Sequence, residues 1–130
     1  MINYWNKYGL LNAQPCDPHS EREENSLLFT GLYLFLLKLT NEPSEKLLQK
    51  YIDFVELCRV GEGLFNCSPK PGTKDKYMSH DNITGLICVS KEFSLNYHTE
   101  IWKTLKRQNF RYDNVNPEKP SWKRLMHPRD

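Results

Sequence analysis

Apolar residues recur at helical spacing in four stretches of the chain, and the first stretch is the most apolar. A helix is expected to begin near Ser20, because Ser20 and Glu23 match the capping box S-x-x-E, in which each side chain bonds the other residue's backbone N–H. Asn41 and Pro43 end it. Its apolar residues cover nearly every face, which is typical of a helix buried on all sides. They are Leu27, Leu28, Phe29, Leu32, Tyr33, Leu34, Phe35, Leu36, Leu37 and Leu39.

The same spacing predicts three further helices. A one-faced surface helix is expected over about residues 44–60, and the longest loop follows it at 61–78. A third helix begins at Ser79, whose hydroxyl can cap the first turn, and a fourth, amphipathic helix spans about 94–108. No run alternates apolar and polar residues strongly enough to predict a sheet. The sequence therefore predicts an all-α fold.

The 130 residues are about the length of one domain. We divide the chain into an irregular N-terminal arm (1–19), a helical-hairpin domain (20–108) and a Pro-rich basic tail (109–130). The domain is expected to hold two antiparallel hairpins, at about 20–60 and 79–108. In each hairpin a buried helix is followed by an amphipathic one.

Charge and hydropathy narrow the classes of partner. Lys and Arg total 18 and Asp and Glu total 16, so the net charge is +2. A charge this small does not favour binding to the phosphates of nucleic acid, so nucleic acid is not expected as a partner. The most apolar run, Leu27 to Leu39, is shorter than the roughly 20 residues of a membrane span, and the first residues lack the pattern of a secretory signal. These features predict no membrane partner and a cytoplasmic or virion-associated protein.

The four cysteines, Cys16, Cys58, Cys67 and Cys88, form no C-x-x-C pair. Reduced and mostly buried thiols are therefore expected, with Cys58 and Cys88 in the core. The histidines, cysteines and carboxylates show no spacing that is specific for a ligand set. The sequence accordingly predicts no metal and no cofactor.

A short repeat links the two helices that are expected to be buried. The segments Glu24–Leu32 and Asp81–Leu86 both carry an acid followed by Asn at the expected helix start, and then Thr-Gly-Leu. An amphipathic helix follows each segment. The final residues, 127–130, stand where a third buried helix would begin. The spacing between these segments along the chain is a plausible period for stacked helical hairpins.

Alternating buried and amphipathic helices, with polar residues at the starts of the buried ones, resemble the (α/α) toroids of many glycoside hydrolases and polysaccharide lyases. In that family the inner helices surround an axis, and the substrate binds near one end of the ring. The resemblance covers about residues 20–130 and implies an incomplete toroid, either an N-terminal fragment or a chain completed by a protein partner or a homo-oligomer. The segments Ser79–Asn82 and His127–Asp130 are also similar to stretches in uncharacterised proteins of tailed bacteriophages.

The toroid resemblance implies a polar rim where the inner helices begin. The candidate catalytic residues are Glu24, Asp81 and His80, because paired carboxylates can cleave a glycosidic bond as acid and base or nucleophile, and a histidine can tune one of them or act as a base. Acids at these positions also complement helix dipoles, which explains their placement without any catalytic role. The candidate binding residues are Glu23, Asn25, Asn82, Trp102 and Trp122.

The leading hypothesis is a glycan-active or glycan-binding domain of phage origin, with a polysaccharide as its partner. Whether it is an enzyme stays open. The aromatic N-terminal arm and the Pro-rich tail support an alternative, a non-enzymatic phage accessory or structural protein that binds a protein partner. Basic residues interleaved with aromatics near the C-terminus give a second alternative, a small nucleic-acid-binding protein, which the small net charge disfavours.

Overall fold

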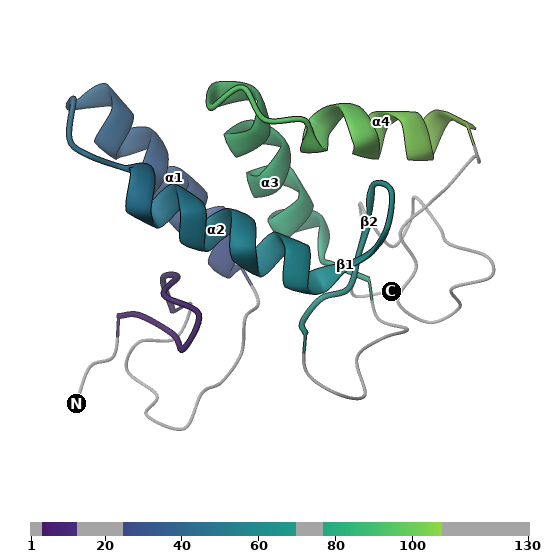
Figure 1. Ribbon diagram of the computed structural model, residues 1–130, viewed down its shortest axis with the longest axis horizontal. Helices are drawn as coiled ribbons and strands as arrows, with labels where there is room; N and C mark the ends of the chain where they lie inside the picture. Colours follow the sequence, from purple (N-terminus) through teal and green to yellow (C-terminus); the bar gives the residue numbers. More distant parts are fainter. Residues whose placement is uncertain (1–3, 13–24, 70–76, 108–130) are drawn as a thin grey trace.

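The computed structural model of the protein describes residues 4–12, 25–69 and 77–107. These residues contain four α-helices and one small antiparallel sheet (Figure 1). The predicted helical character of the fold is confirmed. None of the helices in the described ranges is both long and apolar enough to cross a membrane. In chain order the elements are α1 (Ser26–Leu39), α2 (Glu45–Cys58), β1 (Arg59–Gly61), β2 (Leu64–Phe65), α3 (His80–Glu92) and α4 (Tyr97–Arg107).

The prediction of a fold without any sheet is wrong, because a β-hairpin follows α2 directly. β1 and β2 are antiparallel, with Arg59 opposite Phe65 and Gly61 opposite Leu64. Gly63, between the strands, has a φ of +69°, which glycine adopts without the steric cost of a side chain. Strands of three and two residues are too short to show the alternation by which strands are found in a sequence.

α1 begins later than the sequence predicts. Asn25 precedes it with a left-handed backbone (φ of +63°), so a helix that began near Ser20 cannot continue through this position. The carbonyl of Asn25 instead accepts the first hydrogen bond of α1, from the N–H of Phe29 at 2.9 Å. The predicted capping pair, Ser20 and Glu23, lies outside the described residues.

The start of α3 is as predicted, and the start of α4 is not. The Ser79 hydroxyl accepts a hydrogen bond from the backbone N–H of Asn82 at 3.3 Å and so caps α3. Ser94 has a φ of +57°, which keeps it out of α4. The Ser90 hydroxyl accepts the N–H of His98 at 3.0 Å and lies 2.7 Å from Nδ1 of the same residue. These contacts hold the turn between the two helices.

α1 and α3 form the main helix–helix packing of the fold, and two glycines lie where they cross. A Cβ atom on Gly85 would lie 2.7 Å from Cα of Leu28 and 2.8 Å from the carbonyl oxygen of Leu27. A Cβ atom on Gly31 would lie 2.9 Å from Cγ2 of Val89. The helices can approach this closely because both positions lack a side chain.

Gly31 and Gly85 are the glycines of the two copies of the short sequence repeat, and both lie at this crossing. The other positions of the two copies have different environments in the fold. Thr30 is buried whereas Thr84 is exposed, and Leu32 is exposed whereas Leu86 is buried. The glycine of each Thr-Gly-Leu is thus explained by close packing between α1 and α3.

Residues 4–12 pack beside the helices without forming one. The rings of Tyr8 and Phe54 lie 4.9 Å apart between centroids, and the N–H of Leu11 donates to the buried Thr30 hydroxyl at 2.9 Å. These contacts attach the described part of the N-terminal arm to α1 and α2. The largest fully buried side chains of the core are Tyr51, Phe54, Phe65, Leu10, Leu27, Leu34, Met78, Ile83, Leu86, Ile101 and Val55.

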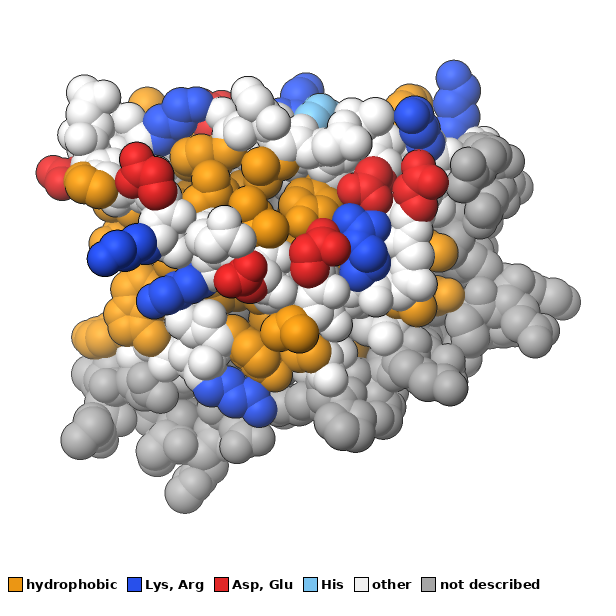
Figure 2. Space-filling view, in the orientation of Figure 1, with side chains coloured by type: hydrophobic (Ala, Val, Ile, Leu, Met, Phe, Trp, Pro, Cys, Tyr) orange, Lys and Arg blue, Asp and Glu red, His pale blue; other side chains and the backbone are white. Residues whose placement is uncertain are grey.

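α2 has the one-faced character that its sequence predicts. Tyr51, Phe54, Val55 and Cys58 are buried along one side. On its outer side, Lys, Arg, Asp and Glu side chains form a band across the face seen in Figure 2. Cys58 is buried as expected, but Cys88, which was also expected in the core, is exposed.

The prediction that α1 is buried on all sides is wrong. One face, which includes Leu27, Gly31 and Leu34, packs into the core. On the opposite face six large apolar side chains are partly exposed, and we call them the α1 stripe. Their exposed fractions are 40% for Phe29, 55% for Leu32, 38% for Tyr33, 42% for Phe35, 55% for Leu36 and 63% for Leu39. One of them, Tyr33, packs edge-on against the Trp5 ring, with 6.1 Å between the ring centroids.

Candidate functional site

Two of the predicted catalytic residues, His80 and Asp81, form a pair at the start of α3. Nε2 of His80 lies 3.1 Å from a carboxylate oxygen of Asp81, and the side chains are 32% and 43% exposed. Nδ1 of His80 is buried and has no hydrogen-bond partner within the described part of the chain. Glu24, the other predicted catalytic carboxylate, lies outside the described residues. The structure therefore brings together one imidazole and one carboxylate of the predicted rim.

Asn82, a predicted binding residue, is buried and caps the neighbouring helix. Its side chain oxygen accepts the backbone N–H groups of Leu27 at 3.1 Å and of Leu28 at 3.3 Å. The Tyr51 hydroxyl donates to the carbonyl of Leu27 at 3.0 Å. The starts of α1 and α3 do converge, but through an amide that satisfies first-turn donors of α1. With only 2% of its surface exposed, Asn82 is poorly placed to bind an external ligand.

The remaining predicted binding residues are not gathered at one place in the described structure. Asn25 precedes α1, where its side chain makes no capping hydrogen bond. Trp102 lies on α4 and is 61% exposed. Glu23 and Trp122 lie outside the described residues.

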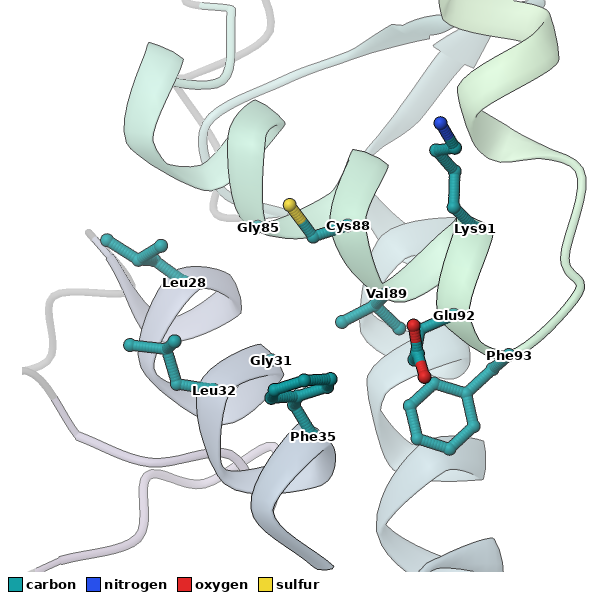
Figure 3. Close-up of a pocket in the computed structure, with 10 residues that line it drawn as sticks. All are labelled: Leu28, Gly31, Leu32, Phe35, Gly85, Cys88, Val89, Lys91, Glu92 and Phe93. Carbon is teal, nitrogen blue, oxygen red and sulfur yellow. The ribbon is translucent and has the colours of Figure 1, made fainter. Parts of the chain in front are cut away.

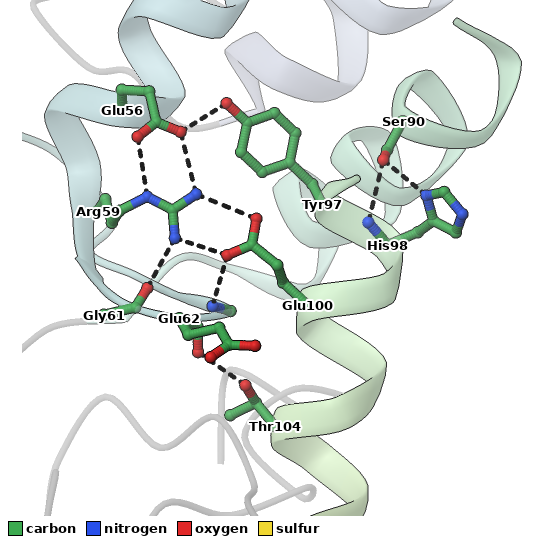
Figure 4. A network of polar contacts seen from close by, with 10 residues as sticks. Glu56, Arg59, Gly61, Glu62, Ser90, Tyr97, His98, Glu100 and Thr104 are labelled. Atoms are coloured by element: carbon green, nitrogen blue, oxygen red, sulfur yellow. Dashed lines mark hydrogen bonds and ion pairs between the residues drawn. The ribbon is translucent and has the colours of Figure 1, made fainter. Parts of the chain in front are cut away.

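A polar network around Arg59, which sequence reasoning missed, joins α2, the β-hairpin and α4 (Figure 4). The guanidinium donates to Glu56 at 2.8 and 3.0 Å, to Glu100 at 2.7 and 3.1 Å, and to the carbonyl of Gly61 at 3.0 Å. These bonds use all five of its N–H groups. Its carbon also lies 5.1 Å from the centroid of the Phe65 ring. The spacing of Glu56 and Arg59 is visible in the sequence, but the partner on α4 is not.

Hydrogen bonds and burial shift the pKa of Glu56, Arg59 and Tyr97 in this network. Hydrogen bonds from Arg59 hold the pKa of Glu56 below its ordinary value, and those to Glu100 and Glu56 raise the pKa of Arg59. Burial, followed by a 2.6 Å hydrogen bond to Glu56, raises the pKa of Tyr97. Such a network suits a structural link between elements better than proton transfer. Across the described ranges, no three His, Cys, Asp or Glu side chains are grouped to hold a metal ion.

We expect the fold to lose stability above about pH 10. Burial raises the pKa of Tyr51 and of Tyr97, so both ionise more readily in the unfolded chain than in the fold. Their contribution to the free energy of unfolding is complete below the pKa of about 10 that tyrosine has in the unfolded chain. It is lost as the pH rises toward the higher pKa values that these tyrosines have in the folded state. Denaturant unfolding at stepwise pH, followed by circular dichroism with tyrosinate absorbance, measures this loss.

The variant Tyr97→Phe should show a smaller alkaline loss of stability than the wild type, because it removes one of the two groups. The burial argument fails if every tyrosine ionises near pH 10 while the circular dichroism stays native.

The α1 stripe is the second feature that sequence reasoning missed. Phe29, Leu32, Leu36 and Leu39 follow each other at intervals of three, four and three residues, as a and d positions do in a heptad repeat. This spacing is present in the sequence. It is hidden there because the core positions of the same helix are also apolar.

A groove of about 470 Å³ between α1 and α3 adjoins the stripe (Figure 3). Near its end, Nζ of Lys38 donates to the carbonyl of Glu92 at 2.7 Å, lies 3.2 Å from its carboxylate, and sits 5.2 Å from the ring centroid of Phe93. This groove is apolar along most of its length. Its lining includes Leu28, Leu32 and Phe35 from α1, and Cys88, Val89 and Phe93 from α3 and its C-terminal end.

No protein-family model, curated protein or solved structure matches this chain. A functional assignment therefore rests on the geometry of the described residues. Their most distinctive surface is the α1 stripe with its adjoining groove, since contiguous exposed apolar patches mark interaction sites on soluble domains.

Proposed function

We propose that this protein is a non-enzymatic interaction protein whose binding surface is the α1 stripe together with the adjoining groove. One observation supports the proposal above all: six large apolar side chains on one helix are 38–63% exposed. Lys38 is the single charged residue among the 14 residues of α1. An exposed helix face of this composition is unusual unless a partner covers it.

The stripe offers a sizeable apolar surface. From the exposed fractions it amounts to roughly 600 Å², counting about 200 Å² for each complete side chain. This is the upper end of the ~300–600 Å² that the largest apolar patch of a monomer reaches, and such patches are often functional.

The hypothesis of a glycan site at the helix starts stays a prediction. Of its rim residues, Asp81 and His80 lie within the described ranges and contact each other. Asp81 also stands in the first turn of α3, where it complements the helix dipole. The interaction hypothesis has the stronger support, because the packing of the described fold does not account for the exposed apolar face of α1, whereas the helix dipole accounts for the position of Asp81.

Photo-crosslinking tests the proposed surface. A photoreactive phenylalanine analogue placed at Leu36 should form an adduct with a macromolecule, whereas the same analogue at the exposed Lys103 of α4 should not. Adding Leu32→Lys should abolish the adduct at position 36, because a charge in the centre of the stripe disfavours its burial. Masses of the adducts, repeated with purified components, identify the partner.

Equal labelling at the two positions, or an adduct at position 36 that survives Leu32→Lys, contradicts the proposal. Circular dichroism of each variant serves as the control for folding. All three positions are exposed, so their substitution should leave the helical signal unchanged.

A further inference from the structure

We infer that the partner of the α1 stripe is a second copy of this chain, packed α1 against α1 about a two-fold axis. The inference rests on the proposed function and names the occupant of the same surface. The observations that support it are the spacing of the apolar residues, the absence of charge from the stripe, the area available and the shape of the adjoining groove.

The spacing suits a helix-to-helix seam. Phe29, Leu32, Leu36 and Leu39 occupy two consecutive heptads at a and d positions, and each is at least 40% exposed. Two isolated helices of 14 residues would be too short to pair stably in water. Here α1 is already folded against α3, so pairing does not bear the cost of forming the helix.

The stripe contains nothing that would repel an identical surface. No stripe residue is charged, and the one charged residue of α1, Lys38, is paired with Glu92 of its own chain. A like-charge contact across a two-fold axis would be the main obstacle to self-association, and none of the stripe residues can make one. Two charged residues, Lys91 and Glu92, line the adjoining groove, and Glu92 is paired with Lys38 of the same chain.

The area of the stripe is compatible with a specific dimer. Complete coverage of roughly 600 Å² on each copy would bury about 1,200 Å² in total, above the ~1,000 Å² expected of a specific interface. An isologous interface needs the same patch to supply both protruding and receiving surfaces. The exposed side chains of the stripe supply one surface, and the mostly apolar groove, which Leu32 and Phe35 of the stripe also line, supplies the other.

Analytical ultracentrifugation and light scattering of the full chain, in reducing buffer, test the inference. We expect the wild type to reach twice its chain mass of 15.4 kDa in the micromolar range. Leu36→Lys should raise the dimer dissociation constant by about 100-fold or more, because each substitution acts on both sides of the axis. Leu32→Lys, in the same seam, should have a similar effect.

Leu57→Lys is the matched control. Leu57 is 59% exposed in the last turn of α2, whereas Leu36 is 55% exposed near the end of α1, and only Leu36 belongs to the stripe. The control should dimerise as the wild type does, and all variants should keep the wild-type circular dichroism.

A wild type that stays at 15.4 kDa at every concentration overturns the inference, as does a control that dissociates as much as Leu36→Lys. A monomeric wild type whose position 36 crosslinks to another macromolecule leaves the proposed function standing and removes only the second copy. If neither dimer nor adduct forms, both proposals fail.

Discussion

Replacing Gly85 by alanine should destabilise the fold by about 2–3 kcal/mol. The added Cβ would meet Cα of Leu28 at 2.7 Å and the carbonyl oxygen of Leu27 at 2.8 Å, and both are backbone atoms that cannot move without moving α1. Separating the helices loosens the main packing of the core. The better helix propensity of alanine returns only about 1 kcal/mol of this cost. Thermal unfolding should show a midpoint lowered by roughly 10 °C.

Gly61→Ala provides the control for Gly85→Ala. A Cβ atom on Gly61 would meet only Cδ1 of Leu64, at 3.9 Å, which is an ordinary contact. Its effect should stay within about 0.5 kcal/mol. The assignment of a close crossing at Gly85 fails if both alanine variants unfold at the same temperature as the wild type.

Asn82→Ala should cost about 3 kcal/mol, because it removes the side chain that caps α1 from α3. The oxygen of Asn82 accepts the N–H groups of Leu27 and Leu28, and Leu27 is completely buried. Without that acceptor, at least one donor is left unsatisfied away from water, which costs about 1–3 kcal/mol by itself. Denaturant unfolding measures the loss, and hydrogen exchange at Leu27 and Leu28 should show reduced protection.

Two further variants distinguish the effect of losing these hydrogen bonds from a general loss of stability caused by any substitution in α3. Asn82→Asp keeps an acceptor at the positive start of α1 and should recover part of the stability lost in Asn82→Ala. Thr84→Ala alters an exposed side chain two positions along and should change stability by less than about 0.5 kcal/mol. If Asp is no better than Ala at position 82, the capping role is incorrect.

Local signals in the sequence were sufficient to predict most helices of this protein. Ser79 caps α3 as its pattern indicates, and α2 lies within its predicted range. The errors at the starts of α1 and α4 arise at Asn25 and Ser94, which adopt positive φ without being glycine. The β-hairpin was missed because it is too short for a recognisable alternation.

The candidate site was less predictable than the helices. The a and d spacing of the α1 stripe can be seen in the sequence. Spacing alone does not show whether the rest of the chain buries an apolar position. The Arg59 network depends on Glu100, which lies 41 residues away in the chain. The acid-Asn pattern predicts a binding role for Asn82, but its side chain is buried and caps α1, a contact that exists only with both helices in place.

Capping residues, glycines and apolar periodicity act within a few residues of each other, so they indicate the approximate positions of the helices without the rest of the fold. Which apolar residues are buried, and which polar residues meet, depends on how the helices pack. Burial depends on contacts between distant segments, such as the crossing at Gly31 and Gly85, and no local pattern encodes how much of α1 the rest of the chain can cover. The described chain covers one face of that helix and leaves large apolar side chains exposed on the other.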